Sequence, residues 1–377
     1  MKRAKAVALY VARTVVGLTF ILSGFVKAID PLGTQYKIQD YLAAIPPSLS
    51  LPDMLTLLMS VSLSMVEFTL GAFMLTAISR RVTARLTLLF MVVMTAVTVW
   101  IYIADPVKDC GCFGDALTLT NLETLLKNIV LLALAALVAW RPTHIGRLMS
   151  RSNQMLLGQM LMLTPVALSF WCLYDLPLID FRPYHIGADI KAGMEIPEGA
   201  EQPVFDTTFI MEKDGERREF TLDNYPDSTW TFVDSKTVTV KEGYVPPIHD
   251  FSITAADGED ITDMVLGREG YTFLLISPDL DKADDQNFGD IDQIYEFCQD
   301  NSIPFYCLTA STEKSQQHWQ NITGAEYPFC MTDATTLKTM IRSNPGLMLL
   351  EKGVVRGKWS HNRLPETTEL ETMLKAR

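Results

Sequence analysis

The sequence predicts a multidomain membrane protein with an all-α membrane part, a β-rich connector and a C-terminal α/β domain. Long apolar runs fill the first half of the 377 residues, whereas the second half has the composition of a water-soluble chain. Residues 1–176 contain 14 Lys and Arg against 9 Asp and Glu, and residues 177–377 contain 18 against 35. An acidic second half argues against nucleic acid or an anionic lipid surface as a partner.

Five apolar runs are long enough to cross a bilayer, which takes about 20 residues of helix. They cover residues 6–29, 54–78, 84–104, 121–140 and 154–175, so the lipid bilayer is an expected partner. The first run follows "MKRAK", which leaves a cleaved signal peptide as the alternative there. Its length, and the absence of a small-x-small site before Lys27, favour a retained helix.

Basic residues are unequally divided between the two sides of these helices, and Lys and Arg concentrate in cytoplasmic loops. One side has Lys2, Arg3, Lys5, Arg80, Arg81, Arg85, Arg141, Arg147 and Arg151. The other side has Lys27, Lys37 and Lys108. We therefore expect a multi-pass protein of the bacterial inner (cytoplasmic) membrane with a cytoplasmic N-terminus. The C-terminal half and the loop between the third and fourth helices are then periplasmic.

That loop contains two cysteines, Cys110 and Cys112, in "KDCGCFGD". Thiols outside the cytosol tend to form disulfides, and cysteines two residues apart can approach the bridging distance. The ring that they close is small and strained, which makes such a bond labile. A labile disulfide suits electron transfer between protein thiols and a lipid-soluble acceptor such as quinone. The alternative is a tight glycine turn without a redox role. Directly afterwards, "TNLE" at residues 120–123 predicts a capping box that starts the fourth helix.

Residues 1–145 resemble the DoxX superfamily of small four-helix membrane proteins. The resemblance rests on "RTVVGLTFILSGFVKAIDP" at residues 13–31 and on Glu67 in "MVEFTLGAFML". The loop "DCGCFGD", with "NLETLLKN" behind it, is similar to the MauE branch of that superfamily. MauE is associated with maturing the disulfide-rich subunit of methylamine dehydrogenase, and related members with thiol oxidation and quinone reduction. The resemblance implies a thiol–disulfide role for Cys110 and Cys112 and leaves the methylamine pathway open.

Two charged residues, Arg13 and Glu67, interrupt the apolar runs, where an unpaired charge is costly. At 1.5 Å per residue, Arg13 lies about 10 Å and Glu67 about 16 Å from the cytoplasmic helix ends. An extended arginine can bridge that difference, so we expect a structural intramembrane ion pair between them. The alternatives are an Arg13 that reaches the inner interface and a protonated, hydrogen-bonded Glu67.

The second half continues after the fifth helix, residues 154–176, and divides near residue 245. In residues 177–245, alternation on both sides of "KDG" predicts a hairpin and thus a small β-rich connector. Residues 246–377 resemble thioredoxin-like domains of the peroxiredoxin and TlpA type, through "PIHDF", the strand "YTFLLIS" and a hairpin with its turn at Lys352–Gly353. Pro345 stands where that fold places a cis-proline facing the active site.

This domain departs from its redox-active relatives at one place. They have Cys-x-x-Cys just after the first long strand, where this chain has "SPDLDKADDQNFGD". The remaining cysteines, Cys172, Cys298, Cys307 and Cys330, are expected to be buried packing residues. The aspartates of that segment, Asp279, Asp281, Asp284 and Asp285, could hold a cation, but their spacing departs from a calcium loop and favours a solvated loop. No metal site is expected.

Two functions remain open at this point. A quinone-linked thiol–disulfide oxidoreductase would use Cys110 and Cys112 as its catalytic residues, with the outer domain docking periplasmic client proteins. A non-catalytic membrane assembly or scaffold protein would instead bind clients through its degenerate thioredoxin-like domain. The cysteine loop favours the first function, and the missing Cys-x-x-Cys favours the second. The client, the electron acceptor and the oligomeric state stay open.

The distribution of basic residues makes a testable prediction about topology. A reporter that is active only in the periplasm is fused after Arg377. We expect it to be active, because five crossings from a cytoplasmic N-terminus place the C-terminus outside. A reporter signal specific to the cytoplasm at the same position would contradict the topology and remove the oxidising setting of the loop.

Overall fold

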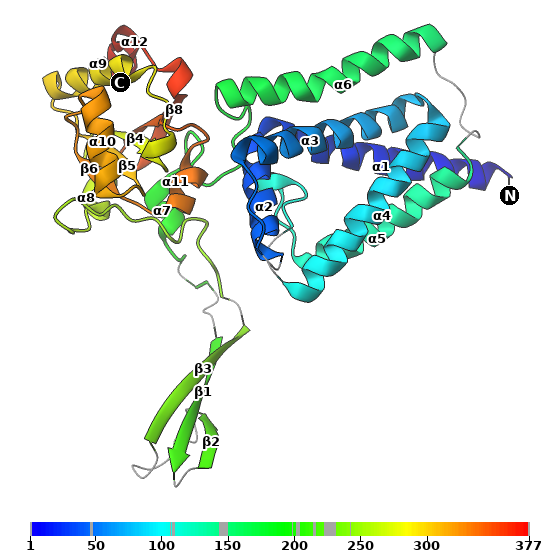
Figure 1. Cartoon of the computed structure of the whole chain (residues 1–377), viewed down its shortest axis with the longest axis horizontal. Helices are drawn as coiled ribbons and strands as arrows, with labels where there is room; N and C mark the ends of the chain where they lie inside the picture. The colour runs from blue at the N-terminus through cyan, green and yellow to red at the C-terminus, as the bar shows by residue number, and fades with distance from the viewer. Residues whose placement is uncertain are drawn as a thin grey trace.

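The computed structural model divides into a helical part, a small sheet and a mixed α/β domain (Figure 1). It describes residues 2–45, 48–105, 107, 110–142, 150–197, 199–200, 204–213, 216–221, 231–241 and 243–375. Several residues used in the sequence analysis lie outside this description: Lys108, Asp109, Arg147, Asp214, Gly215 and Arg377.

Within the described residues, five helices have the length and apolar composition to cross a membrane, which confirms the expected spans. They are α1 (Lys2–Ile29), α3 (Asp53–Thr76), α4 (Arg80–Ala104), α5 (Asn121–Trp140) and α6 (Arg151–Tyr174). Thr120 and Glu123 form the expected capping box at the start of α5. A further helix, α2 (Pro31–Ala44), was not expected. It starts because Pro31 suits the first turn of a helix and the Asp30 carboxylate accepts a hydrogen bond from the Gly33 amide.

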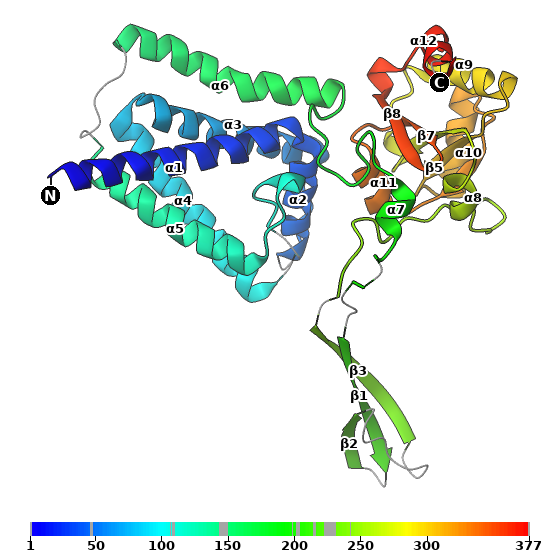
Figure 2. The same cartoon turned by 180° about the vertical axis from the view of Figure 1, so that it is seen from behind.

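The antiparallel helices α1 and α3 form the closest pair of the membrane part. A Cβ atom on Gly24 would lie 2.4 Å from the Phe68 nitrogen, and one on Gly71 would lie 2.7 Å from the Gly17 oxygen. Small residues permit this backbone approach between apolar helices. The α4–α5 pair shares a buried core with α1 and α3, and α6 packs against α3 and α1 on the outside (Figure 2). These glycine contacts therefore fix the axial register of α3 against α1.

The small sheet contains β1 (Val204–Lys213), β2 (Glu216–Thr221) and β3 (Thr231–Lys241) in the order β2–β1–β3. All pairs are antiparallel, and Lys213 is paired with Glu216, so the two strands of the expected hairpin are confirmed. Figures 1 and 2 show this sheet projecting away from both other parts.

The C-terminal domain has a five-stranded mixed sheet in the order β6–β5–β4–β7–β8. Its strands are β4 (Tyr271–Ser277), β5 (Phe305–Thr309), β6 (Phe329–Met331), β7 (Gly346–Glu351) and β8 (Val354–Ser360). Its helices are α8 (Thr262–Leu266), α9 (Phe288–Asp300), α10 (Glu313–Thr323), α11 (Ala334–Met340) and α12 (Thr367–Lys375).

A parallel β4–α9–β5 unit followed by the antiparallel β7–β8 hairpin is a thioredoxin-like arrangement, as the sequence predicts. The peptide bond before Pro345 is cis, as expected. Successive residues of β4 point to opposite faces, so the sheet has a core on each side. Cys298, Cys307 and Cys330 are buried in these cores, which confirms them as packing residues.

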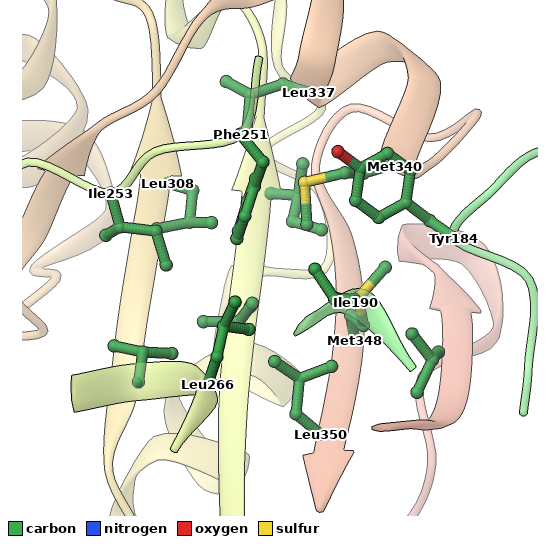
Figure 3. Close-up of a cluster of buried hydrophobic side chains, with 14 of the residues drawn as sticks. Tyr184, Ile190, Phe251, Ile253, Leu266, Leu308, Leu337, Met340, Met348 and Leu350 are labelled. Atoms are coloured by element: carbon green, nitrogen blue, oxygen red, sulfur yellow. The ribbon is translucent and has the colours of Figure 1, made fainter. Parts of the chain in front are cut away.

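The prediction of a single connector over residues 177–245 is wrong for its first part. Tyr184 and Ile190 pack into one core of the thioredoxin-like domain, beside Met348 and Leu350 (Figure 3). The Gly187 amide also donates a hydrogen bond to the Val355 carbonyl. These apolar side chains cover one face of the sheet, together with the short helix α7 (Ile190–Met194). The three-stranded sheet is therefore an insertion within the domain.

Candidate functional site

The two cysteines of the loop between α4 and α5 lie side by side. The Cys110 and Cys112 sulfur atoms are 3.0 Å apart, and both residues are free thiols. Between them, Gly111 has a φ of +61°, a left-handed conformation that favours glycine. A Cβ atom at this position would also lie 3.2 Å from the Lys37 side chain. Gly111 thus allows the tight turn that brings the two thiols together.

Polar groups of the helical part hold the backbone of both cysteines. The Tyr41 hydroxyl donates a hydrogen bond to the Cys110 carbonyl at 2.6 Å. The Lys27 ammonium group lies 2.7 Å from the Cys112 carbonyl and 2.8 Å from a Glu67 carboxylate oxygen. The Ser23 hydroxyl lies 2.7 Å from this same carboxylate oxygen and 2.7 Å from the Cys112 carbonyl. The thiol loop is therefore anchored to α1, α2 and α3.

The expected ion pair between Arg13 and Glu67 is wrong, because Glu67 pairs with Lys27. Arg13 instead donates hydrogen bonds to the Met74 and Leu75 carbonyls at the far end of α3. The glycine contacts explain the exchange of partners. They place Phe68 opposite Gly24, so the neighbouring Glu67 lies near the level of Gly24 in α1. Arg13 is 11 residues before Gly24, which corresponds to about 17 Å along the helix, so it lies far from Glu67.

Lys27 and Glu67 are both 4% exposed, so they form a buried pair. Their partnership had a signal in the sequence, since Ser23 and Lys27 are four residues apart and share one face of α1. The register of α3 against α1 was the missing information, and glycines at positions 17, 24 and 71 could have supplied it.

The two thiols differ in their electrostatic surroundings. The hydrogen bond from the Cys110 thiol lowers the pKa of Cys112 to about 6, with Lys127 and Lys27 contributing in the same direction against burial. That hydrogen bond and burial raise the pKa of Cys110. Of the two thiols, Cys112 is therefore the one that loses its proton more readily. A thiolate is the form that reacts in thiol–disulfide exchange.

Cavities lie on both sides of the thiol loop. Inside the bundle, a cavity of ≈ 40 Å³ is lined by Cys112, Glu67, Lys127 and Phe113, among other residues. It has room for water but is far smaller than the about 300 Å³ typical of small-molecule sites. On the outside, a cleft of ≈ 290 Å³ borders Gly111 and separates the loop from the thioredoxin-like domain.

The remaining predicted residues of the thioredoxin-like domain form structural contacts. Next to Pro345, the Asn344 side chain donates a hydrogen bond to the Asp279 carbonyl. The Asp279 carboxylate accepts from the Asp281 amide, and Asp281 accepts from Ser315. Within the described part of the chain, no group of His, Cys, Asp and Glu could hold a metal ion.

Two segments of the chain match models of known protein families. Residues 5–141 match the family model described as Methylamine utilisation protein MauE, which confirms the MauE resemblance of the membrane part. Residues 205–242 match a model described as Domain of unknown function (DUF8463). None of the curated proteins matches the chain.

Two solved structures are similar to about a third of the chain. One is the solution structure of a proposed protein disulfide isomerase from Bacteroides thetaiotaomicron, with 17% identity and a TM-score of 0.28, covering 33% of this chain and 86% of that one. The other is a thioredoxin-like protein from Aeropyrum pernix, with 16% identity and a TM-score of 0.28, covering 34% and 89%.

The buried pair makes a prediction about stability. Lys27→Met and Glu67→Gln should each lower the free energy of unfolding by about 3–5 kcal/mol, because each leaves one charge buried without its partner. The double variant should recover part of this loss. Thermal unfolding of the purified protein in detergent measures all three variants.

The exposed Lys282–Asp53 pair provides the matched control for this measurement. Lys282→Met should cost less than about 1 kcal/mol, as is usual for exposed ion pairs. Losses at Lys27 and Glu67 that simply add in the double variant would contradict a direct pair.

Proposed function

We propose that the protein is a membrane thiol–disulfide oxidoreductase that passes electrons between client proteins and a lipid-soluble acceptor through Cys110 and Cys112. One observation carries the proposal: the sulfur atoms lie 3.0 Å apart in a loop whose two cysteine carbonyls are both anchored. The lowered pKa of one thiol adds the reactivity that exchange requires. The match of residues 5–141 to the MauE model is consistent with this function.

In the oxidising direction, the cycle starts from a Cys110–Cys112 disulfide. A client thiolate attacks the Cys110 sulfur, the disulfide breaks, and Cys112 leaves as a thiolate. Cys112 is the better leaving group because its pKa is the lower of the two. A second client thiolate then attacks the client sulfur of the mixed disulfide and releases Cys110. The client loses two electrons and two protons, and the loop gains them.

Reoxidation of the loop requires an acceptor for two electrons and two protons, and we propose a quinone of the bilayer, which leaves as the quinol. Cys112 faces the cavity inside the bundle, so its side of the loop is the one nearer to lipid. Because this cavity is small, the quinone ring needs displacement of lining side chains such as Phe90 and Met94 to approach the sulfur. Electrons would then enter at Cys110 and leave from Cys112.

We place this chemistry at the bacterial inner membrane, with the thiol loop in the periplasm. Arg342 of the thioredoxin-like domain contacts the loop, so both lie at the same end of the helical part. The basic residues Arg80, Arg81 and Arg151 stand at the other ends of these helices, as cytoplasmic residues do. The clients are then periplasmic proteins, and the thioredoxin-like domain is the surface on which they dock.

A second function, assembly without catalysis, is favoured by one observation. The segment after β4 has aspartates where redox-active thioredoxin-like domains have cysteines, and Asp279 caps a short turn there. In that function the domain binds clients, and the Cys110–Cys112 turn only shapes the loop.

The acidic thiol makes a prediction about pH dependence. Alkylation of the reduced protein should follow an apparent pKa of about 6, because Cys112 is a thiolate above that pH. Cys110→Ala removes the hydrogen bond that lowers this pKa, so the profile should move up toward the ordinary value of about 8.5. Iodoacetamide labelling from pH 5 to 9, read by mass spectrometry of the loop peptide, tests both. An unshifted profile in the variant would contradict the role of Cys110.

The proposed exchange also predicts trapped intermediates. Cys112→Ala leaves Cys110 without its neighbouring thiol, so a mixed disulfide with a client should persist on non-reducing gels. Cys172→Ala, a change at a buried cysteine of α6, is the matched control and should trap nothing. If neither single variant of the loop traps an adduct, and Ser at both positions supports normal growth, the assembly function takes the place of the redox function.

A further inference from the structure

The thioredoxin-like domain is docked on the helical part through the edge where such domains usually carry out their chemistry. Lys282 follows β4, in the segment that replaces Cys-x-x-Cys, and forms an ion pair with Asp53 at 2.8 Å. The Lys338 ammonium group of α11 lies 4.9 Å from the ring centre of Tyr36 in α2. Arg342, three residues before the cis-proline, also faces the helical part. This edge is therefore occupied by the protein's own membrane part.

Arg342 makes the most extensive of these contacts. Its guanidinium group lies 2.9 Å from each carboxylate oxygen of Asp30 and 3.4 Å from the nearer oxygen of Asp115. It also donates a hydrogen bond to the Lys338 carbonyl. Arg342 is 7% exposed, so its contact with Asp30 is largely shielded from water, whereas the Asp115 side chain is 44% exposed and its contact lies at the edge of the interface.

Both carboxylates that Arg342 holds belong to the surroundings of the thiols. Asp115 lies in the short helical turn η1 (Gly114–Ala116), three residues after Cys112. Asp30 directly follows α1 and stands three residues after Lys27, which contacts the Cys112 carbonyl. One side chain of the thioredoxin-like domain thus joins the thiol loop to the end of the helix that anchors it.

We infer that Arg342 is a positioning residue of the thiol pair, so that the site is complete only when the thioredoxin-like domain is docked. This inference rests on the proposed function and assigns a task to a domain that lacks its own cysteines. Arg342 acts through Asp115 on the loop and does not touch the sulfur atoms.

Charge explains why the loop depends on this arginine. Burial raises the pKa of Asp115, the charge of Arg342 opposes that shift, and the neighbouring Asp30 adds to it. Without Arg342, Asp30 and Asp115 would lose the cation that lies between them, and their repulsion would be opposed only by the more distant charges of Arg182 and Lys37. We expect this repulsion to move the Asp115 end of the loop away from α1. The Tyr41, Lys27 and Ser23 contacts hold the cysteine carbonyls, whereas the Arg342 contact holds the Asp115 end of the same loop.

A looser loop changes the equilibrium of the disulfide. Closing an intramolecular bond depends on the effective concentration of one sulfur at the other, which falls as the connecting segment gains freedom. The Cys110–Cys112 disulfide should therefore become easier to reduce when Arg342 is removed, with no change at either cysteine.

The experiment measures this equilibrium in the full-length protein in nanodiscs, equilibrated in glutathione buffers of graded ratio. Alkylation mass shift gives the fraction of the loop disulfide. Arg342→Gln should lower the equilibrium constant for disulfide formation by about tenfold, the effect expected for losing a charge-assisted hydrogen bond. Asp115→Asn should lower it by a smaller factor, and Arg342→Lys should restore part of the loss, because lysine keeps the charge without the planar fork.

Two controls separate positioning from a general effect on folding. Arg356→Gln breaks an ion pair with Glu351 elsewhere on the same domain and should leave the equilibrium constant unchanged. Asp115→Asn alters the loop and leaves every residue of the thioredoxin-like domain in place, so it tests the contact even if Arg342→Gln weakens that domain. The double variant Arg342→Gln/Asp115→Asn should not exceed Arg342→Gln alone, since both changes break the same contact.

Equilibrium constants within twofold of wild type for both Arg342→Gln and Asp115→Asn would overturn the inference while leaving the proposed function standing. A wild-type loop that forms no disulfide in any buffer would overturn the proposed function itself, and the inference with it. The two failures are therefore distinguishable from one set of samples.

Discussion

The contact between Lys27 and Glu67 is the interaction on which the membrane part depends. Two charges with 4% exposure each are stable only together, because removing water from an ion is costly unless a partner replaces it. The pair therefore requires α1 and α3 to keep one register, which the glycine contacts also select. Since Lys27 also reaches the Cys112 carbonyl, the same requirement extends to the thiol loop. The packing of α1 against α3 and the position of the Cys112 carbonyl therefore depend on the same ion pair.

The thiol loop lies between two different environments. Cys112 lines the small cavity among the helices, whereas Gly111 borders the larger cleft next to the thioredoxin-like domain. The loop therefore borders a space among the helices on one side and a space next to the thioredoxin-like domain on the other. The difference between the pKa values of the two thiols comes first from the hydrogen bond between them, to which Lys127 and Lys27 add on the side of Cys112.

Local signals made most of the elements predictable. Apolar length revealed the five spans, the Thr120–Glu123 pattern marked the start of α5, and the turn at Lys352–Gly353 divided β7 from β8. Tertiary information was missing elsewhere. Counting depth from helix ends gave Glu67 the wrong partner. The packing of Tyr184 and Ile190 in one core with residues of β7, more than 150 residues later in the chain, had no local pattern. The cysteine pair was visible as a motif, but its anchors come from three other helices and could not be read from the loop alone.

The inserted three-stranded sheet has a consequence for how this architecture can vary. The chain leaves the thioredoxin-like domain after α7 and returns at Ile248, whose amide donates a hydrogen bond to the Gly193 carbonyl. Departure and return therefore meet at one point, and the strands between them lie apart from both cores (Figure 1). The fold therefore allows such a module to be lost, lengthened or exchanged while the thioredoxin-like domain keeps its shape. The length and sequence of the projecting sheet can thus diverge independently of the residues around Cys110 and Cys112.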